Sequence, residues 1–184
     1  IQLLAKHSKF RGIRPMLQDI PDPDWMLKEN LANAFHALRN FDLTFDALVY
    51  PKHLPNLIRL VERYPDLKVV VDHGAKPLIA AKEFEPWASN LKELASHANV
   101  YCKFSGLLNE AGVGASFESM KPYIDHLFSS FGTKRLMWGS DYPVLNLFGD
   151  YVSWYEACYA YVSPLGLDAL NDVFGQVAAN FYNL

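Results

Sequence analysis

The feature that most constrains the fold is an uninterrupted run of β-branched residues, Val69 to Val71, within the stretch LKVVVDHGA (67–75). Such a run is typical of a strand buried on both faces, as in a parallel sheet covered by helices. Other short apolar runs also predict strands, and longer segments with helical spacing of apolar residues separate them. The five predicted strands lie at 12–17, 44–50, 67–75, 100–107 and 135–142.

The segments between these strands predict helices. Asp24 is a plausible N-cap for the first of them, and the opening residues 1–10 also show helix-like spacing of apolar side chains without a cap. The alternation of strands and helices predicts βα units, a parallel sheet and an α/β fold. The length of 184 residues, 51% of them hydrophobic, supplies one core, so we expect a single domain over 1–184. The predicted helices lie at 24–38, 56–64, 86–97, 117–131, 150–162 and 168–182.

Composition and missing motifs argue against several classes of function. The net charge is −3 and no basic stripe carries interleaved aromatic residues, so nucleic acid is not an expected partner. No apolar run approaches the roughly 20 residues of a membrane span. The chain has no GxGxxG, Walker, GxSxG, HExxH or HxH motif. Cys102 and Cys158 are isolated, which is typical of a reducing compartment, and we expect a cytoplasmic protein.

Polar residues gather in or just after the predicted strands. The carboxyl ends of parallel strands meet at one edge of a sheet, where α/β barrels and open α/β sheets build their sites. This pattern therefore indicates a functional site at that edge. The residues concerned are Arg14, Asp72, His73, Lys103, Ser105 and Asp141.

Two of these residues could serve either chemistry or structure. His73 fits a metal ligand or a polar contact to substrate, but it also fits a histidine that simply caps a strand end. Gly74 and Lys76 follow at once, so the backbone turns sharply and brings a cation nearby. Asp141 fits a general base or metal ligand, and equally an Asx-type turn within Ser-Asp-Tyr-Pro.

The remaining candidates have the same two interpretations. Arg14 lies in an apolar strand and needs an anionic partner, which is either a ligand oxygen or an internal carboxylate such as Asp72. Tyr101, Lys103 and Ser105 share one face of their strand, because side chains alternate in direction. That face is either a pocket wall or the solvated side of an edge strand.

Five blocks of sequence, taken together and in order, resemble the amidohydrolase-related family of sugar-lactone hydrolases, which includes L-fuconolactonase-like and L-rhamnonolactonase-like proteins. The resemblance runs from about residue 10 to the C-terminus. It implies a (β/α)8 TIM barrel of the amidohydrolase superfamily, with the five strands here as strands 4 to 8 and about the first three lacking. The blocks are GIRPMLQDIPDPDWM, TFDALVYPKHLP, VVVDHGAKP, VYCKFSGLLNEA and RLMWGSDYPVLNL.

The resemblance also implies roles for individual residues. His73 is similar to the histidine at the end of strand 6, and Asp141 to the strand-8 aspartate that binds metal or activates water. Arg14 is similar to a strand-4 arginine that faces substrate, and Lys76 lies near the expected pocket. Lys103, Ser105 and Tyr142 complete the expected substrate contacts.

The metal centre implied by this resemblance is incomplete in this chain. Family members begin with an HxH motif on strand 1, and no such motif is present here. A mononuclear zinc site usually keeps three protein ligands, whereas this chain supplies at most His73 and Asp141. Members of the family also differ in whether they need a metal. We therefore expect either one divalent metal, such as zinc, or metal-independent chemistry.

The expected activity is hydrolysis of a sugar-type or related lactone in carbohydrate catabolism, with water activated by Asp141. One alternative is a superfamily decarboxylase of an aromatic or acrylate-type acid. The other is a truncated, non-catalytic barrel fragment, whose two open sheet edges would invite pairing with a second copy of the chain. The expected partner is a small-molecule lactone, with neither nucleic acid nor membrane involved.

Overall fold

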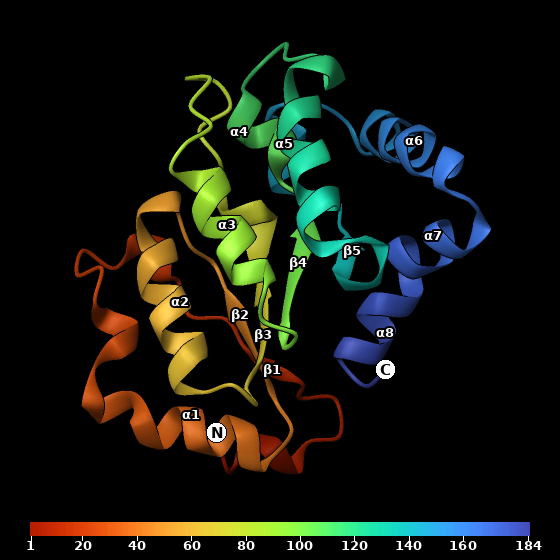
Figure 1. The fold of residues 1–184 in the computed structure, drawn as a ribbon. Coiled ribbons are helices and arrows are strands. Elements are labelled where there is room, and N and C mark those ends of the chain that lie inside the picture. Colours follow the sequence, from red (N-terminus) through yellow and green to blue (C-terminus); the bar gives the residue numbers. More distant parts are fainter.

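The computed structural model describes residues 1–184 and is built around one sheet of five parallel strands. All five predicted strands are confirmed (Figure 1). Each is shorter than its apolar run, because residues such as Asp72 and Gly106 already turn away from the sheet. The strands are β1 (Gly12–Ile13), β2 (Thr44–Ala47), β3 (Lys68–Val71), β4 (Val100–Phe104) and β5 (Leu136–Trp138).

The helices follow the predicted pattern with several corrections. The predicted helix 24–38 is wrong in its first part, because two 3-10 turns occupy 25–31 and Asp24 forms no side-chain cap. The opening residues form only a 3-10 turn, Leu4–Lys6, and a π-helical turn at Asp172–Gln176 interrupts the last predicted helix. The helices are α1 (Ala32–Asn40), α2 (Leu54–Arg63), α3 (Trp87–Ala95), α4 (Leu107–Ala111), α5 (Phe117–Phe131), α6 (Tyr151–Val162), α7 (Leu167–Asn171) and α8 (Val177–Phe181).

The strands are ordered in space as they are in the chain, from β1 to β5. Right-handed crossovers between strands in this order place the connecting helices on one face of the sheet. Figure 1 shows α2, α3 and α5 along that side. A parallel sheet in sequential order with outer helices is the arrangement of a (β/α)8 barrel, so the expected fold class is confirmed, with five strands present.

The valine run has the two-sided burial that the sequence predicts. Val69 and Val71 pack into the large core under the helices, whereas Val70 belongs to a second, smaller apolar cluster on the opposite face. In that smaller cluster, α8 supplies Val177 and Phe181. The C-terminal helix therefore covers part of the face that the other helices leave open. None of the helices combines the length and apolarity that crossing a bilayer requires.

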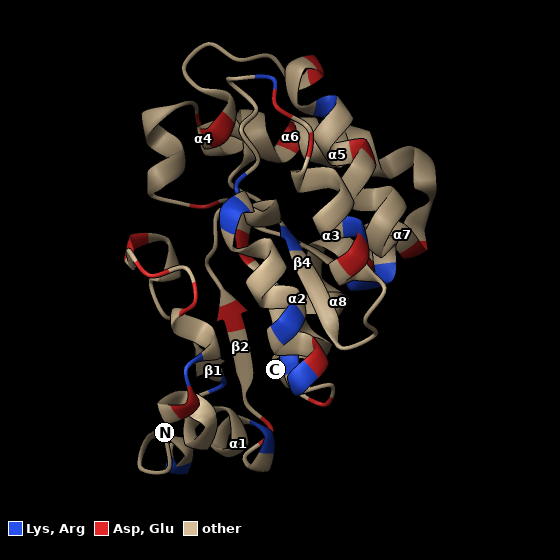
Figure 2. Cartoon of the chain, turned by 60° about the vertical axis from the view of Figure 1, so that its left-hand side comes forward, with Lys and Arg blue, Asp and Glu red and all other residues tan.

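A layer of charged residues lies on the same inner face. The ammonium of Lys103 lies 2.8 Å from a carboxylate oxygen of Asp46 and 2.7 Å from one of Asp72. Tyr182, just after α8, donates its hydroxyl hydrogen to Asp46. Burial alone would lower the pKa of Lys103, but Asp72 and Asp46 outweigh it and raise that pKa above its ordinary value. Figure 2 shows the acidic segment of β2 and the basic segment of β4 in this region.

Strands β1 and β2 approach each other so closely at Gly12 that there is no room for a side chain. It is paired with Thr44, and a Cβ atom at Gly12 would lie 2.0 Å from Thr44 Oγ1 and 2.5 Å from the Thr44 carbonyl oxygen. Gly12→Ala must shift backbone, so we expect it to lower the free energy of unfolding by about 1–3 kcal/mol in urea titrations. Gly175→Ala is the matched control, because its Cβ meets no atom within 4 Å. Equal unfolding midpoints for the two variants would contradict this packing.

Candidate active site

A left-handed turn ends β3 and carries two of the predicted site residues. His73, Gly74, Ala75 and Lys76 all have positive φ, at 53°, 57°, 61° and 52°. Left-handed backbone costs roughly 1–2 kcal/mol for each residue other than glycine. The turn is stabilised by the indole N–H of Trp87, which donates to the Gly74 carbonyl at 2.7 Å, and by the Lys76 N–H, which donates to the His73 carbonyl at 2.9 Å.

The loop after β5 has a similar support. The indole N–H of Trp154, on α6, donates to the Gly139 carbonyl at 3.0 Å. Both tryptophans are almost fully buried. The backbone on either side of the site is therefore anchored to the core, one anchor just after β3 and the other just after β5.

His73 and Asp141 meet between these two anchored loops. His73 Nε2 lies 3.5 Å from Asp141 Oδ1, and His73 Nδ1 lies 2.8 Å from Ser105 Oγ. The His73 and Asp141 side chains are 10% and 16% exposed. Residues that follow three neighbouring strands, β3, β4 and β5, are thus brought together where the sequence predicts a site.

The imidazole of His73 is held neutral near pH 7. Burial is the main cause and lowers its pKa to about 4. The Asp141 carboxylate opposes this shift, while Lys76, Lys103 and Arg14 add to it. A neutral imidazole carries one N–H donor and one acceptor, so it can orient a polar group without itself carrying charge.

Asp141 forms contacts that differ from those of a turn former. Its backbone is left-handed, with φ of 59°, and its Oδ2 accepts a hydrogen bond from Asn109 Nδ2. The turn hydrogen bond predicted for its side chain is made instead by Ser140, whose Oγ accepts from the Tyr142 N–H at 3.2 Å. Asn109 was not among the predicted site residues, because it lies 32 residues from Asp141 in the sequence and no local pattern connects the two.

The other predicted site residues are placed differently from one another. Arg14 is half exposed and lies 3.7 Å from Asp72, a long ion pair that leaves much of its guanidinium open. Lys76 pairs with Glu110 at 3.1 Å. Lys103 forms ion pairs with Asp46 and Asp72, and Tyr142 is largely exposed. Ser105 is buried, and its hydroxyl contacts His73.

The chain alone does not make up a zinc site. His73 Nε2 and Asp141 Oδ1 face each other and could share a cation, but no group of three His, Cys, Asp or Glu side chains lies together to hold a metal. Catalytic zinc usually takes three protein ligands. His73 and Asp141 alone fall short of that number.

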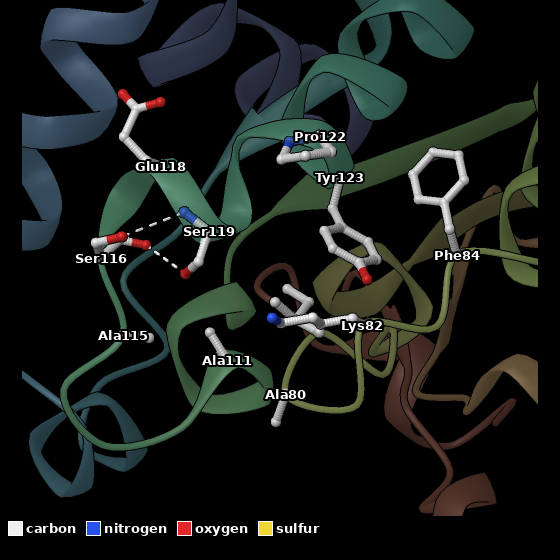
Figure 3. A pocket seen from close by; sticks show the side chains of 11 residues that line it. Ala80, Lys82, Phe84, Ala111, Ala115, Ser116, Glu118, Ser119, Pro122 and Tyr123 are labelled. Atoms are coloured by element: carbon white, nitrogen blue, oxygen red, sulfur yellow. Dashed lines mark hydrogen bonds between the residues drawn. The ribbon is translucent and has the colours of Figure 1, made fainter.

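The largest hollow in the surface lies away from this pair. It measures about 660 Å³ and lies between the loop 79–84 and the start of α5, with Tyr123 directed toward Lys82 (Figure 3). A smaller hollow of about 290 Å³ beside β1 is lined in part by Arg14 and Asp46. The site is therefore defined by its convergent polar groups and not by the volume of its opening.

The tryptophan anchors predict a difference among three similar substitutions. Trp87→Phe and Trp154→Phe each leave a glycine carbonyl without its donor, which costs about 1–3 kcal/mol of unfolding free energy when the group is buried. Trp138→Phe is the matched control, because the indole nitrogen of Trp138 lies near the Cys158 thiol and donates to no backbone carbonyl. In urea unfolding, Trp138→Phe should lower the free energy of unfolding less than Trp87→Phe and Trp154→Phe do. The reverse order would show that the two indole hydrogen bonds do not stabilise the loops.

The lowered pKa of His73 predicts a dependence of stability on pH. Between pH 6.5 and about 4, His73 takes up a proton in the unfolded chain but not in the folded one. The contribution of neutral His73 to the free energy of unfolding is therefore fully present above pH 6.5 and is lost as the pH falls through this window. The stability of the wild type relative to His73→Gln should fall by roughly 1–3 kcal/mol across it. If the unfolding free energies of the wild type and His73→Gln differ by the same amount throughout this pH window, the lowered pKa of His73 is contradicted.

Comparison with known proteins identifies the family of the chain. Residues 3–184 match the amidohydrolase family model. The chain is 47% identical over 188 residues to an L-fucono-1,5-lactonase of Burkholderia ambifaria, with 100% of this chain and 65% of that protein covered. It is 34% identical over 155 residues to an L-fucono-1,5-lactonase of Burkholderia multivorans, with 78% and 52% covered.

Solved structures extend the likeness to the fold. An amidohydrolase from Burkholderia multivorans with bound zinc superposes with a TM-score of 0.88 at 31% identity, over 97% of this chain and 66% of that one. The chain therefore spans about two-thirds of the length of such relatives or less. By sequence match and by fold, the chain belongs to the amidohydrolase family.

Proposed function

We propose that this chain is the part of a lactone hydrolase that supplies the general base and contacts to the substrate. The observation that carries the proposal is the pair formed by Asp141 and neutral His73, at the ends of β5 and β3. Asn109 occupies one oxygen of Asp141, which leaves the other facing His73. The names of the lactonase relatives support a cyclic ester as the substrate class.

Asp141 is the general base in this proposal. Its Oδ1 takes a proton from water as the water oxygen bonds to the ester carbonyl carbon. When the intermediate collapses, the bond from that carbon to the ring oxygen breaks, and the proton passes to the departing alkoxide. The product is a hydroxy acid, and Asp141 is returned to its starting state. His73, which is neutral, orients the attacking water.

In this proposal two cations stabilise the charge that develops on the carbonyl oxygen. Arg14 has an open guanidinium near the buried Asp72, and Lys76 follows His73 in the left-handed turn. Preorganised cationic donors aimed at an oxyanion usually give the largest single contribution to catalysis of this type. We assign substrate oxygens to Arg14 and Lys76, and a contact at the rim of the site to the exposed Tyr142.

Asp141→Asn tests the proposed base in the intact protein. The substitution keeps the size of the side chain and removes its basicity, so hydrolysis of a sugar δ-lactone should fall about 10²- to 10⁴-fold. A pH-stat measures the acid released. Asp66→Asn is the matched control, because the Asp66 carboxylate is 75% exposed and pairs with Arg39 at the surface.

Three results would reject the proposal. Normal lactone hydrolysis by Asp141→Asn would exclude the general base. Release of CO2 from an aromatic or acrylate-type acid, with no ring opening, would favour a decarboxylase. Absence of both reactions in the intact wild-type protein would favour a non-catalytic role.

A further inference from the structure

The segment Ser105–Asn109 contacts both members of the catalytic pair. Ser105, just after β4, places its Oγ 2.8 Å from His73 Nδ1, and Asn109, in α4, donates to Asp141 Oδ2. Gly106 has a φ of 68°, and a Cβ atom on it would lie 2.7 Å from His73 Cγ. The backbone of the segment therefore lies directly against the imidazole, and a side chain at Gly106 would displace it.

The contacts of His73 decide which of its nitrogens carries the proton. An ionised carboxylate only accepts hydrogen bonds, so the contact between Nε2 and Asp141 Oδ1 is attractive only if Nε2 carries hydrogen. Nδ1 then accepts from the Ser105 hydroxyl. The opposite tautomer would direct a lone pair of Nε2 at the carboxylate, and burial strengthens that repulsion.

The contact of Asn109 fixes the second member of the pair. Its amide must direct Nδ2 at Asp141, because the reversed amide would place an oxygen against the carboxylate. The Asn109 Oδ1 is left buried without a hydrogen-bond partner. The orientation of this amide is therefore set by Asp141, and Oδ1 of Asp141 remains the oxygen available to a proton.

We propose that Ser105 and Asn109 are positioning residues, which together form a clamp that holds the imidazole of His73 against the carboxylate of Asp141. Ser105 fixes the His73 ring by donating to Nδ1, and Asn109 keeps Asp141 Oδ1 directed at Nε2, so that the carboxylate in turn keeps the His73 proton on Nε2. This role replaces the substrate contact expected of Ser105. The effect of the clamp on catalysis rests on the proposed lactone hydrolysis, but the tautomer of His73 is a property of the folded chain alone.

Nitrogen NMR tests the tautomer without any substrate. In protein labelled with 15N-histidine at pH 7, two-bond 1H–15N correlations distinguish protonated from unprotonated ring nitrogens, and His73→Gln assigns the signals. We expect Nε2 protonated and Nδ1 unprotonated in the wild type, and a changed Nδ1 chemical shift in Ser105→Ala, because Nδ1 then loses its hydrogen-bond donor. Ser129→Ala is the control, because Ser129 is exposed and donates to the His126 carbonyl. A wild type protonated on Nδ1, or a Ser105→Ala spectrum equal to that of the wild type, would overturn the clamp.

Kinetics separate failure of the clamp from failure of the proposed function. If both hold, Ser105→Ala and Asn109→Ala each lower kcat about 10- to 100-fold and leave KM near the wild-type value. If the expected spectra are obtained but the wild type hydrolyses no lactone, the proposed function fails and the clamp stands. If KM rises while kcat is unchanged, the two residues bind substrate and the positioning role is wrong.

Discussion

Two indole N–H groups hold the site in place, and its geometry depends on them. Trp87 donates to the carbonyl of Gly74 and Trp154 to that of Gly139, so one glycine beyond β3 and one beyond β5 are each tied to a helix. The left-handed turn at 73–76 is unfavourable by itself, and it persists only where its surroundings hold it. Packing of α3 and α6 therefore determines where His73 and Asp141 lie.

The charged layer on the inner face supports the same turn from the opposite side. Lys103 lies between Asp46 and Asp72, and these three residues come from β4, β2 and the end of β3. Buried ion pairs add little net stability, but breaking one leaves an uncompensated charge, which is costly. The layer therefore favours one arrangement of the strands over others. Because Asp72 immediately precedes His73, fixing its carboxylate also fixes where the left-handed turn begins.

The sequence predicted the strands and the edge at which the site forms, because both depend on local patterns. The valine run and the spacing of the apolar segments were sufficient for the sheet, and polar residues after strands indicated the site. The partners of these residues could not be predicted in the same way. Lys103 meets Asp46 across 57 residues of sequence, and Asn109 meets Asp141 across 32. Asp24 was wrongly expected to cap a helix, because 3-10 turns replace the first part of that helix.

Supporting and reactive atoms are separated within the site. The tryptophans contact backbone carbonyls, Ser105 contacts Nδ1 of His73, and Asn109 contacts Oδ2 of Asp141. None of these contacts uses His73 Nε2 or Asp141 Oδ1, the two atoms that face each other. Each ring or carboxylate is thus held through one polar atom, while its other polar atom faces the partner residue. A site with this division can keep its geometry through a reaction cycle, because Asp141 Oδ1, the atom proposed to exchange the proton, is not one of the atoms that hold the site together.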